Sequence, residues 1–202
     1  MLTSLLVRLK HSCPMLWRGV ENVNSTLMRM RYDSLPQFAA REVEALNLRR
    51  TDGLAWSLVT PDDAPALSDF LCSLPTDRLV YFNPHPFDAA TLGRMASGRS
   101  FVMLKVSDPD GRIVGYHFLR CFWVGRTFHG LTVAPDFGGR GIGGEMWALG
   151  ARIADAAGMS MRATISEANQ PSLRSCSRAT RCTILSHLDN GYLLVDCKPL
   201  DT

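Results

Sequence analysis

The spacing of apolar residues changes character near residue 54. Over residues 1–53, apolar side chains recur at helical spacing among polar ones, which predicts an N-terminal helical extension. From Leu54 onward, short β-rich runs alternate with helical segments, which predicts a main domain over residues 54–202. The apolar positions of the extension are Leu5, Leu6, Leu9, Leu16, Trp17, Val20, Val23, Leu27 and Met30.

The main domain begins with a predicted strand over 54–60 and a helix that starts after Thr60 and reaches about Leu74. A proline-rich loop, 81–88, leads to a helix that Asp88 caps and that ends near Gly98. Three antiparallel strands follow, over 100–107, 112–121 and about 122–133, the first two joined by a turn at Asp110 and Gly111 and the third interrupted near Gly125 and Arg126. The remaining predicted elements are a helix after a glycine-rich turn, a strand over 160–166, a helix over 169–179 and a hairpin over 181–197.

Composition limits the classes of function. The net charge of +3 over 202 residues is too small to argue for nucleic-acid binding, since Lys and Arg form no run in the main domain. No apolar stretch is long enough to span a bilayer and the first residues do not resemble a secretory signal, so we expect a soluble, cytoplasmic protein. The cysteines at 13, 72, 121, 176, 182 and 197 form no CxxC pair and no zinc spacing, so we expect no metal site.

The extension is basic. Up to Tyr32 its charged residues are Arg8, Lys10, Arg18, Arg29 and Arg31 against Glu21, a composition also typical of helices on anionic membrane surfaces. Packing against the main domain or against a second subunit, in a homodimer, is the simpler interpretation and the one we favour.

The glycine-rich turn within residues 131–158 carries the clearest chemistry. Five glycines between 138 and 144 let the backbone curl closely around a ligand, and the helix that follows directs its positive end and free amides at the same place. We therefore predict an anion site, to which Arg140 adds a cation. A turn without a ligand is the alternative, although so many glycines cost considerable chain entropy.

Two other phosphate-binding motifs can be compared with this turn. Residues 139–144 satisfy G-x-G-x-x-G, but antiparallel strands precede them, whereas a dinucleotide fold would place them after an early strand and continue with further βα units. A Walker motif is excluded because no Gly-Lys-Ser/Thr is present.

The run VAPDFGGRGIG, from Val133 to Gly143, resembles the acetyl-CoA signature V-x-P-x-x-[QR]-x-x-G-x-[GA] of the GNAT superfamily, and the order of elements over 54–197 also agrees. The resemblance implies an α/β (α+β) fold with a mixed, mostly antiparallel sheet flanked by helices, and acetyl-CoA in a V-shaped opening between the fourth and fifth strands. Gly138 stands where the signature has Gln or Arg, so it offers only backbone donors. The implied contacts of acetyl-CoA are Leu131, Thr132, Val133, Gly138, Gly139, Arg140, Gly141, Ile142, Gly143, Gly144, Asn169 and Ser172.

Acetylation of an amine requires a base for the attacking nitrogen and an acid for the departing thiolate. The family commonly places a glutamate four residues before the signature valine, where this chain has His129. His129 suits a base by its ordinary pKa, or is a half-buried packing residue, and Glu167 offers a carboxylate through water. Where many members have a tyrosine acid this chain has Cys176, whose thiol is the candidate to return the proton, although a cysteine on an apolar helix face is more often buried.

The acceptor pocket should form from the first helices of the main domain, their loop and the final hairpin. Asn83, His85, Phe87 and Tyr192 are the candidate contacts, although such a loop can also cover the core as a lid. The basic extension and this loop resemble acetyltransferases of bacterial surface-polysaccharide assembly, so a nucleotide-linked amino sugar is the expected small-molecule amine. The alternative is a GNAT-shaped domain that binds CoA or a partner without catalysis.

Overall fold

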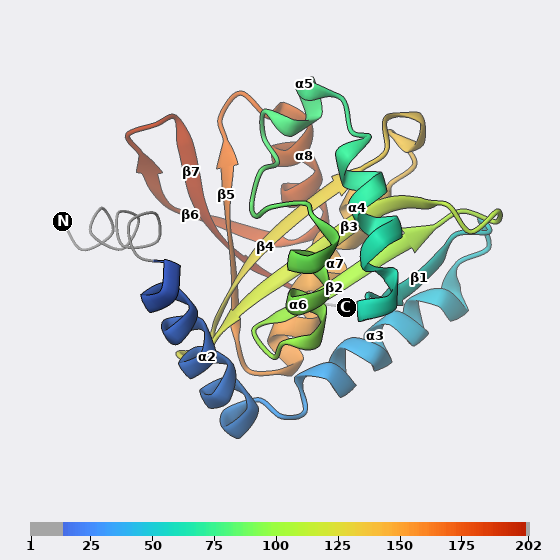
Figure 1. Ribbon diagram of the computed structural model, residues 1–202. Helices are drawn as coiled ribbons and strands as arrows, with labels where there is room; N and C mark the ends of the chain where they lie inside the picture. Colours follow the sequence, from blue (N-terminus) through green and yellow to red (C-terminus); the bar gives the residue numbers. More distant parts are fainter. Residues whose placement is uncertain (1–13, 201–202) are drawn as a thin grey trace.

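The computed structural model describes residues 14–200 of the chain (Figure 1). The apolar residues Leu5, Leu6 and Leu9 and the basic residues Arg8 and Lys10 of the predicted extension lie outside the described residues. The described chain forms one seven-stranded sheet in the order β1-β2-β3-β4-β5-β7-β6, in which only β4 and β5 pair in parallel. The fold is therefore the mixed, mostly antiparallel sheet that the sequence predicted. Its strands are β1 (Ala55–Leu58), β2 (Phe101–Ser107), β3 (Ile113–Phe122), β4 (Arg126–Val133), β5 (Ser160–Ser166), β6 (Arg181–Leu188) and β7 (Tyr192–Lys198).

Helices cover both faces of the sheet. In the view of Figure 1, α4 and α6 lie in front of the sheet, and α7 and α8 lie behind it. Helix α7 packs closely on β3, because a Cβ on Gly115 of β3 would lie only 2.7 Å from the methyl carbon of Met146. The helices are α2 (Pro14–Arg31), α3 (Leu35–Arg49), α4 (Ala64–Cys72), α5 (Thr76–Leu79), α6 (Ala89–Ser97), α7 (Ile142–Ala156) and α8 (Gln170–Ala179), with 3-10 turns η1 (Pro61–Asp63) and η2 (Pro135–Phe137).

The described part of the N-terminal extension packs on the main domain. Met28 of α2 and Leu35 and Val43 of α3 are buried in the same apolar cluster as the sheet. The side-chain amide of Asn47 pairs with the backbone of Trp56, accepting from its N–H at 3.0 Å and donating to its carbonyl at 2.8 Å. The end of α3 is thus fixed to β1. No helix among residues 14–200 is both long and apolar enough to cross a membrane.

Local signals in the sequence placed most element boundaries. Asp88 caps α6, its carboxylate accepting from the Thr91 N–H at 2.8 Å. The predicted interruption near Gly125 and Arg126 is a turn over residues 123–125, in which Gly125 has a φ of 82°, and the third antiparallel strand begins after it, at Arg126. The single helical turn α5 was not predicted, since four residues carry too little periodicity to be recognised.

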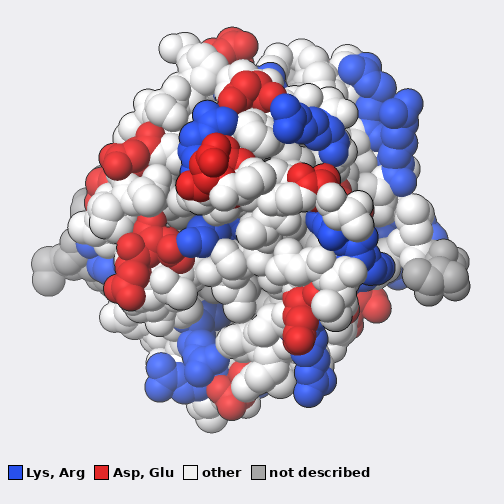
Figure 2. Space-filling view, turned by 90° about the vertical axis from the view of Figure 1, so that its right-hand side faces the viewer, with Lys and Arg blue, Asp and Glu red and all other residues white. Residues whose placement is uncertain are grey.

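Surface charge is mixed. On the face shown in Figure 2, Lys and Arg groups alternate with Asp and Glu groups and with broad uncharged areas, apart from a short run of blue at the upper right edge. This distribution agrees with the small net charge of +3. On this face, the charges do not form the continuous basic surface that nucleic-acid binding uses.

Candidate functional site

The parallel strands β4 and β5 separate part of the way along their length. They pair only where Arg126–Phe128 lies beside Ser160–Arg162. Both strands continue beyond this point, β4 to Val133 and β5 to Ser166, and β5 keeps its pairing with β7 on its other edge. The sheet therefore forks after Phe128, as the resemblance implied for the fourth and fifth strands.

Backbone amides of β4 face the fork. The Ala134 N–H donates to the Val114 carbonyl of β3 at 2.8 Å. Because alternate residues of a strand direct their amides to opposite edges, the N–H groups of Leu131 and Val133 point toward the β5 side. Thr132 is turned the other way in the ladder, and its side chain is buried opposite Tyr116. Of these residues, Leu131 and Val133 are the ones whose main chain is available to a ligand in the fork.

The glycine-rich turn ends where α7 begins. Gly139 and Gly141 have φ values of 77° and 78°, in the left-handed region that glycine adopts without a steric penalty. Gly141 is the N-cap of α7, and no side chain caps the helix there. The first amides of a helix have no acceptor within it, so those of Ile142, Gly143 and Gly144 point outward at its positive end.

Space for a ligand lies over this turn. A Cβ on Gly139 or Gly141 would meet nothing within 4 Å. A Cβ on Gly143 would lie 3.5 Å from Oγ of Ser175 and 3.9 Å from Cδ1 of Leu131, which places α8 and β4 beside the start of α7. The turn therefore adjoins the open end of the fork, and its free amides can hold an anion there.

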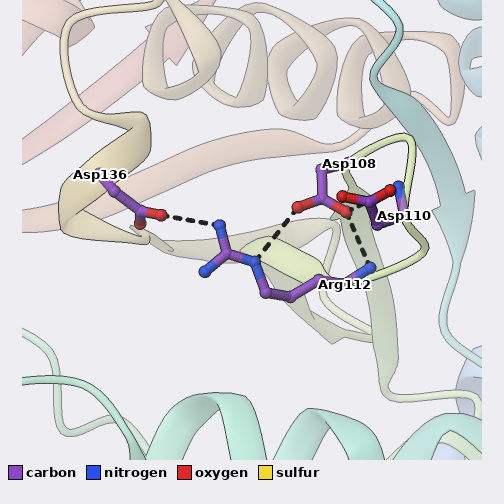
Figure 3. A network of polar contacts seen from close by, with 4 residues as sticks. All are labelled: Asp108, Asp110, Arg112 and Asp136. Carbon is purple, nitrogen blue, oxygen red and sulfur yellow. Dashed lines mark hydrogen bonds and ion pairs between the residues drawn. The ribbon is translucent and has the colours of Figure 1, made fainter.

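A salt-bridge network braces the turn from outside (Figure 3). Arg112, just after the β2–β3 turn, donates from Nη2 to Asp136 at 2.7 Å and from Nε to Asp108 at 3.2 Å. The hydrogen bond from Arg112 lowers the pKa of Asp136, and the same bond is the main cause of the raised pKa of Arg112. The guanidinium carbon also lies 5.3 Å from the centre of the Phe137 ring. The conformation of η2, immediately before the glycines, is thus fixed to another hairpin.

Two further arginines lie at the turn. The Arg140 guanidinium stacks over Phe137, with 4.3 Å from its central carbon to the ring centre. Arg78 of α5 brings Nη2 to 4.0 Å from the place where a Cβ on Gly138 would be. Sequence reasoning missed Arg78, and no local pattern could have revealed it, because its neighbour in the fold is remote along the chain.

His129 lies at the fork, with its side chain under α7. It is the first β4 residue beyond the last pair with β5, and its ring stacks on Trp147 with 4.0 Å between centres. The His117 ring lies 4.6 Å away, and within residues 14–200 none of the ring nitrogens of the two histidines has a hydrogen-bond partner. Burial lowers the pKa of His117 to about 3, and burial together with repulsion from His117 holds the pKa of His129 well below its usual range. Both rings are therefore neutral near pH 7.

Two of the predicted acceptor residues, His85 and Phe87, lie on the opposite face of the sheet from His129. His85 Nε2 is 3.2 Å from the buried Tyr116 hydroxyl, and its ring contacts Phe87 and Phe118 edge-on. Gly130 of β4 makes room for this cluster, because a Cβ there would lie 2.5 Å from the Phe118 ring. Burial raises the pKa of Tyr116 well above its usual value, so its phenol keeps its proton.

The other predicted acceptor contacts stand apart from this cluster. Asn83 is exposed on the same loop, and Tyr192 is half-buried at the start of β7, opposite Ser166 and Leu188. The structure thus brings His85 and Phe87 together and leaves Asn83 and Tyr192 separate from the ring contacts.

The remaining candidates come from the region after β5. Glu167 is exposed and pairs with Nδ1 of His187 at 2.9 Å. Asn169 caps α8, its side-chain oxygen accepting from the Ser172 N–H at 3.2 Å, which gives both residues a structural task. Cys176 is fully buried, and hydrogen bonding to Cys197 together with burial raises the pKa of its thiol far above the usual range.

Two surface hollows of the described residues lie elsewhere. One of about 710 Å³ is lined by α4, α6 and η1, and one of about 420 Å³ lies between α3 and β1. Neither includes residues of the glycine-rich turn.

Comparison with known proteins agrees with the architecture. The family model described as "Acetyltransferase (GNAT) family" matches residues 68–178. No curated protein matches the chain.

Solved structures share the fold at low sequence identity. The GNAT domain of an S. lividans protein, PAT, has a TM-score of 0.60 at 18% identity, over 70% of this chain and 88% of that one. The yncA protein of Salmonella typhimurium, solved with acetyl-CoA, has a TM-score of 0.60 at 18% identity, over 74% and 95%. An aminoglycoside acetyltransferase in complex with coenzyme A and kanamycin has a TM-score of 0.54 at 14% identity, over 72% and 94%.

Proposed function

The chain belongs to the acetyltransferase (GNAT) family, and from this premise we propose that it moves an acetyl group from acetyl-CoA to the amine of a small molecule. The observation that carries the proposal is the fork between β4 and β5, which has the free amides of the glycine-rich turn beside its open end. A ligand whose anionic group binds at the turn can place an extended arm along the β4 edge, with the end of the arm near His129. Acetyl-CoA supplies a diphosphate for the turn and an activated thioester at the end of such a chain.

The residues present fit this donor. The amides of Ile142, Gly143 and Gly144 are directed at a phosphate, and the positive φ of Gly139 and Gly141 leaves the space above them open. Along the fork, the amides of Leu131 and Val133 can hydrogen-bond an extended arm as a neighbouring strand would. Arg140, exposed beside the turn, adds a positive charge.

Arg78 replaces the side chain that Gly138 lacks. In the signature a Gln or Arg occupies that position, and here a guanidinium from α5 reaches the same place from outside, 4.0 Å from the missing Cβ. We expect Arg78→Ala to weaken acetyl-CoA binding about tenfold, the effect of one charge-assisted hydrogen bond. Arg41→Ala, which removes an exposed arginine of α3, is the control. If Arg78→Ala weakens the binding of acetyl-pantetheine, which has no diphosphate, by the same factor, Arg78 does not act on the diphosphate.

We assign proton removal from the amine to His129, because it is the first side chain of β4 past the fork and its imidazole is neutral. Its low pKa makes it a weak base, so we expect His129→Ala to lower kcat at least ~30-fold, somewhat less than the roughly 10² to 10⁴ typical of acid–base groups. Near-normal turnover would leave His129 with packing alone.

Glu167 is a weaker candidate for proton transfer. It follows the end of β5, five residues past Arg162, which is about 16 Å along an extended strand from the last β4–β5 pair. We expect Glu167→Gln to lower kcat less than His129→Ala does. A larger loss would give the proton-transfer role to Glu167.

For the acceptor we propose an amino sugar bound at His85 and Phe87, the partly exposed members of the aromatic cluster that they form with the buried Tyr116 and Phe118. The cluster and His129 lie on opposite faces of the sheet, so in this proposal the amine reaches His129 through the fork between β4 and β5. The partly exposed rings of Phe87 and His85 suit the apolar face of a sugar ring, and the buried Tyr116 hydroxyl and the Pro86 carbonyl hold the His85 ring in place. An acceptor of the similar aminoglycoside acetyltransferase is of this chemical class. Use of a nucleotide-linked sugar in surface-polysaccharide assembly is the narrower form of the same proposal, and Asn83 and Tyr192 are its outer contacts.

Two measurements test the proposal. Calorimetry with acetyl-CoA should give saturable binding that a Gly141→Val variant loses, because Val cannot adopt the left-handed φ at that position. Thiol release should then follow addition of an amine from a panel of amino sugars, polyamines and amino acids. Binding without turnover of any acceptor would favour a non-catalytic CoA-binding domain, and no binding by folded protein would refute the donor site.

A further inference from the structure

Three cysteines from three different elements meet behind the sheet. Cys176 lies on α8, Cys182 on β6 and Cys197 on β7, where Cys182 and Cys197 are directly opposite each other in the ladder. Their sulfur atoms all lie within 4.8 Å of one another, and those of Cys176 and Cys197 are 3.5 Å apart. Three thiols thus converge on one point that the acetyl-transfer proposal does not use.

These separations match those around one metal ion. A zinc–sulfur bond of about 2.3 Å in tetrahedral geometry places two thiolate sulfurs about 3.8 Å apart, so the cluster needs only small side-chain shifts. We propose that Cys176, Cys182 and Cys197 form a binding site for a single thiophilic metal ion, with Zn²⁺ as its probe. Thiolate ligands select such ions over the hard cations Mg²⁺ and Ca²⁺.

The surroundings of the three thiols allow a metal ion to enter from solvent. Cys176 and Cys197 are buried, whereas Cys182 is partly exposed and opens the cluster to solvent on the β6 side. Binding of one Zn²⁺ forms three Zn–S bonds and releases three thiol protons to solvent, and a water molecule completes the tetrahedron from the exposed side. The Thr180 hydroxyl lies 3.6 Å from the Cys176 sulfur and donates to the Cys176 carbonyl at 2.9 Å, so it would have to give up that bond to donate to a thiolate.

Cys121 provides a matched comparison. It is fully buried like Cys176, yet it stands on β3 outside the cluster. The sequence did not predict this site, because Cys176, Cys182 and Cys197 come from separate elements and have none of the short spacings of zinc motifs.

The test uses the full-length protein, reduced and freed of metal under anaerobic conditions. We expect one equivalent of Zn²⁺ to bind, with release of protons, and Cd²⁺ to give a thiolate charge-transfer band in the ultraviolet. Saturating Zn²⁺ should raise Tm by roughly 5–10 °C. Cys182→Ser, at the partly exposed position, should weaken Zn²⁺ binding at least ~100-fold, as should Cys197→Ser. Cys121→Ser and Cys72→Ser should bind like the wild type.

Three results would overturn the proposal. The first is reduced, folded wild type that binds no Zn²⁺. The second is equal binding by Cys182→Ser and wild type, which would place the metal elsewhere. The third is a Cys176–Cys197 disulfide in freshly purified protein whose reduced form does not bind Zn²⁺. That result would mean that the cysteines form a disulfide and not a metal site. Far-ultraviolet circular dichroism of each variant separates loss of the site from loss of the fold.

Discussion

The buried pair of His117 and His129 makes stability depend on pH in a direction that the structure fixes. The pKa of His117 is about 3 in the folded protein against about 6.5 when unfolded, so between these values only the unfolded chain takes up the proton. Stability is therefore fully present above the unfolded pKa and is lost as pH falls toward 3. From about pH 7.5 to about pH 5.5, His117 alone removes about 1.4 kcal/mol from the free energy of unfolding. His129 acts in the same direction.

The assay is urea unfolding at several pH values, followed by tryptophan fluorescence, for the wild type and for His117→Leu. Leu has nearly the volume of His and cannot titrate, so the wild type should lose about 1.4 kcal/mol more than the variant over this interval. Carboxylates titrate in both proteins and cancel in the comparison. His187→Gln, at a histidine whose side chain is 73% exposed, controls for the loss of a histidine as such. Equal pH slopes for the wild type and His117→Leu would refute the reasoning.

Further predictions concern the glycines and the brace of the turn. Gly130→Ala should destabilise by about 1–3 kcal/mol in urea unfolding, because its Cβ would lie 2.5 Å from the Phe118 ring, and an effect below that range would mean that the ring moves freely. Gly19→Ala is its control: a Cβ there meets nothing within 4 Å in α2, so stability should rise by about 0.5–1 kcal/mol. Arg112→Ala should weaken acetyl-CoA binding in calorimetry about five- to tenfold through a looser turn, while leaving stability in urea unfolding nearly unchanged, since the Arg112 ion pairs are exposed to solvent. Unchanged affinity would show that the turn keeps its shape without the brace.

Features encoded within a few residues were predictable. Asp88 caps α6 because its carboxylate reaches an amide three residues on, and Gly139 and Gly141 take the left-handed backbone that the motif required. The alternation of β4 correctly put His129 on the same face as Leu131 and Val133.

Features made by residues remote in sequence were not predictable. The stacking of His129 on Trp147 depends on how α7 crosses the sheet, which periodicity does not determine. Arg78 reaches Gly138 only because the unpredicted turn α5 lies beside η2. The three thiols of α8, β6 and β7 meet through strand register, and register is set by the complete hairpin.

The fork has a mechanical consequence. Only three residue pairs join β4 to β5. The sheet therefore has two parts, β1 to β4 and the trio β5, β7 and β6, which are connected by a short stretch of parallel pairing. Helix α7 contacts β4, β5 and β7 and so packs across both parts of the sheet. A small change in the angle between these two parts of the sheet would widen or narrow the fork without breaking a ladder hydrogen bond. Helix α7, which packs across both parts, begins at the glycine-rich turn, so such a change would also act on the turn.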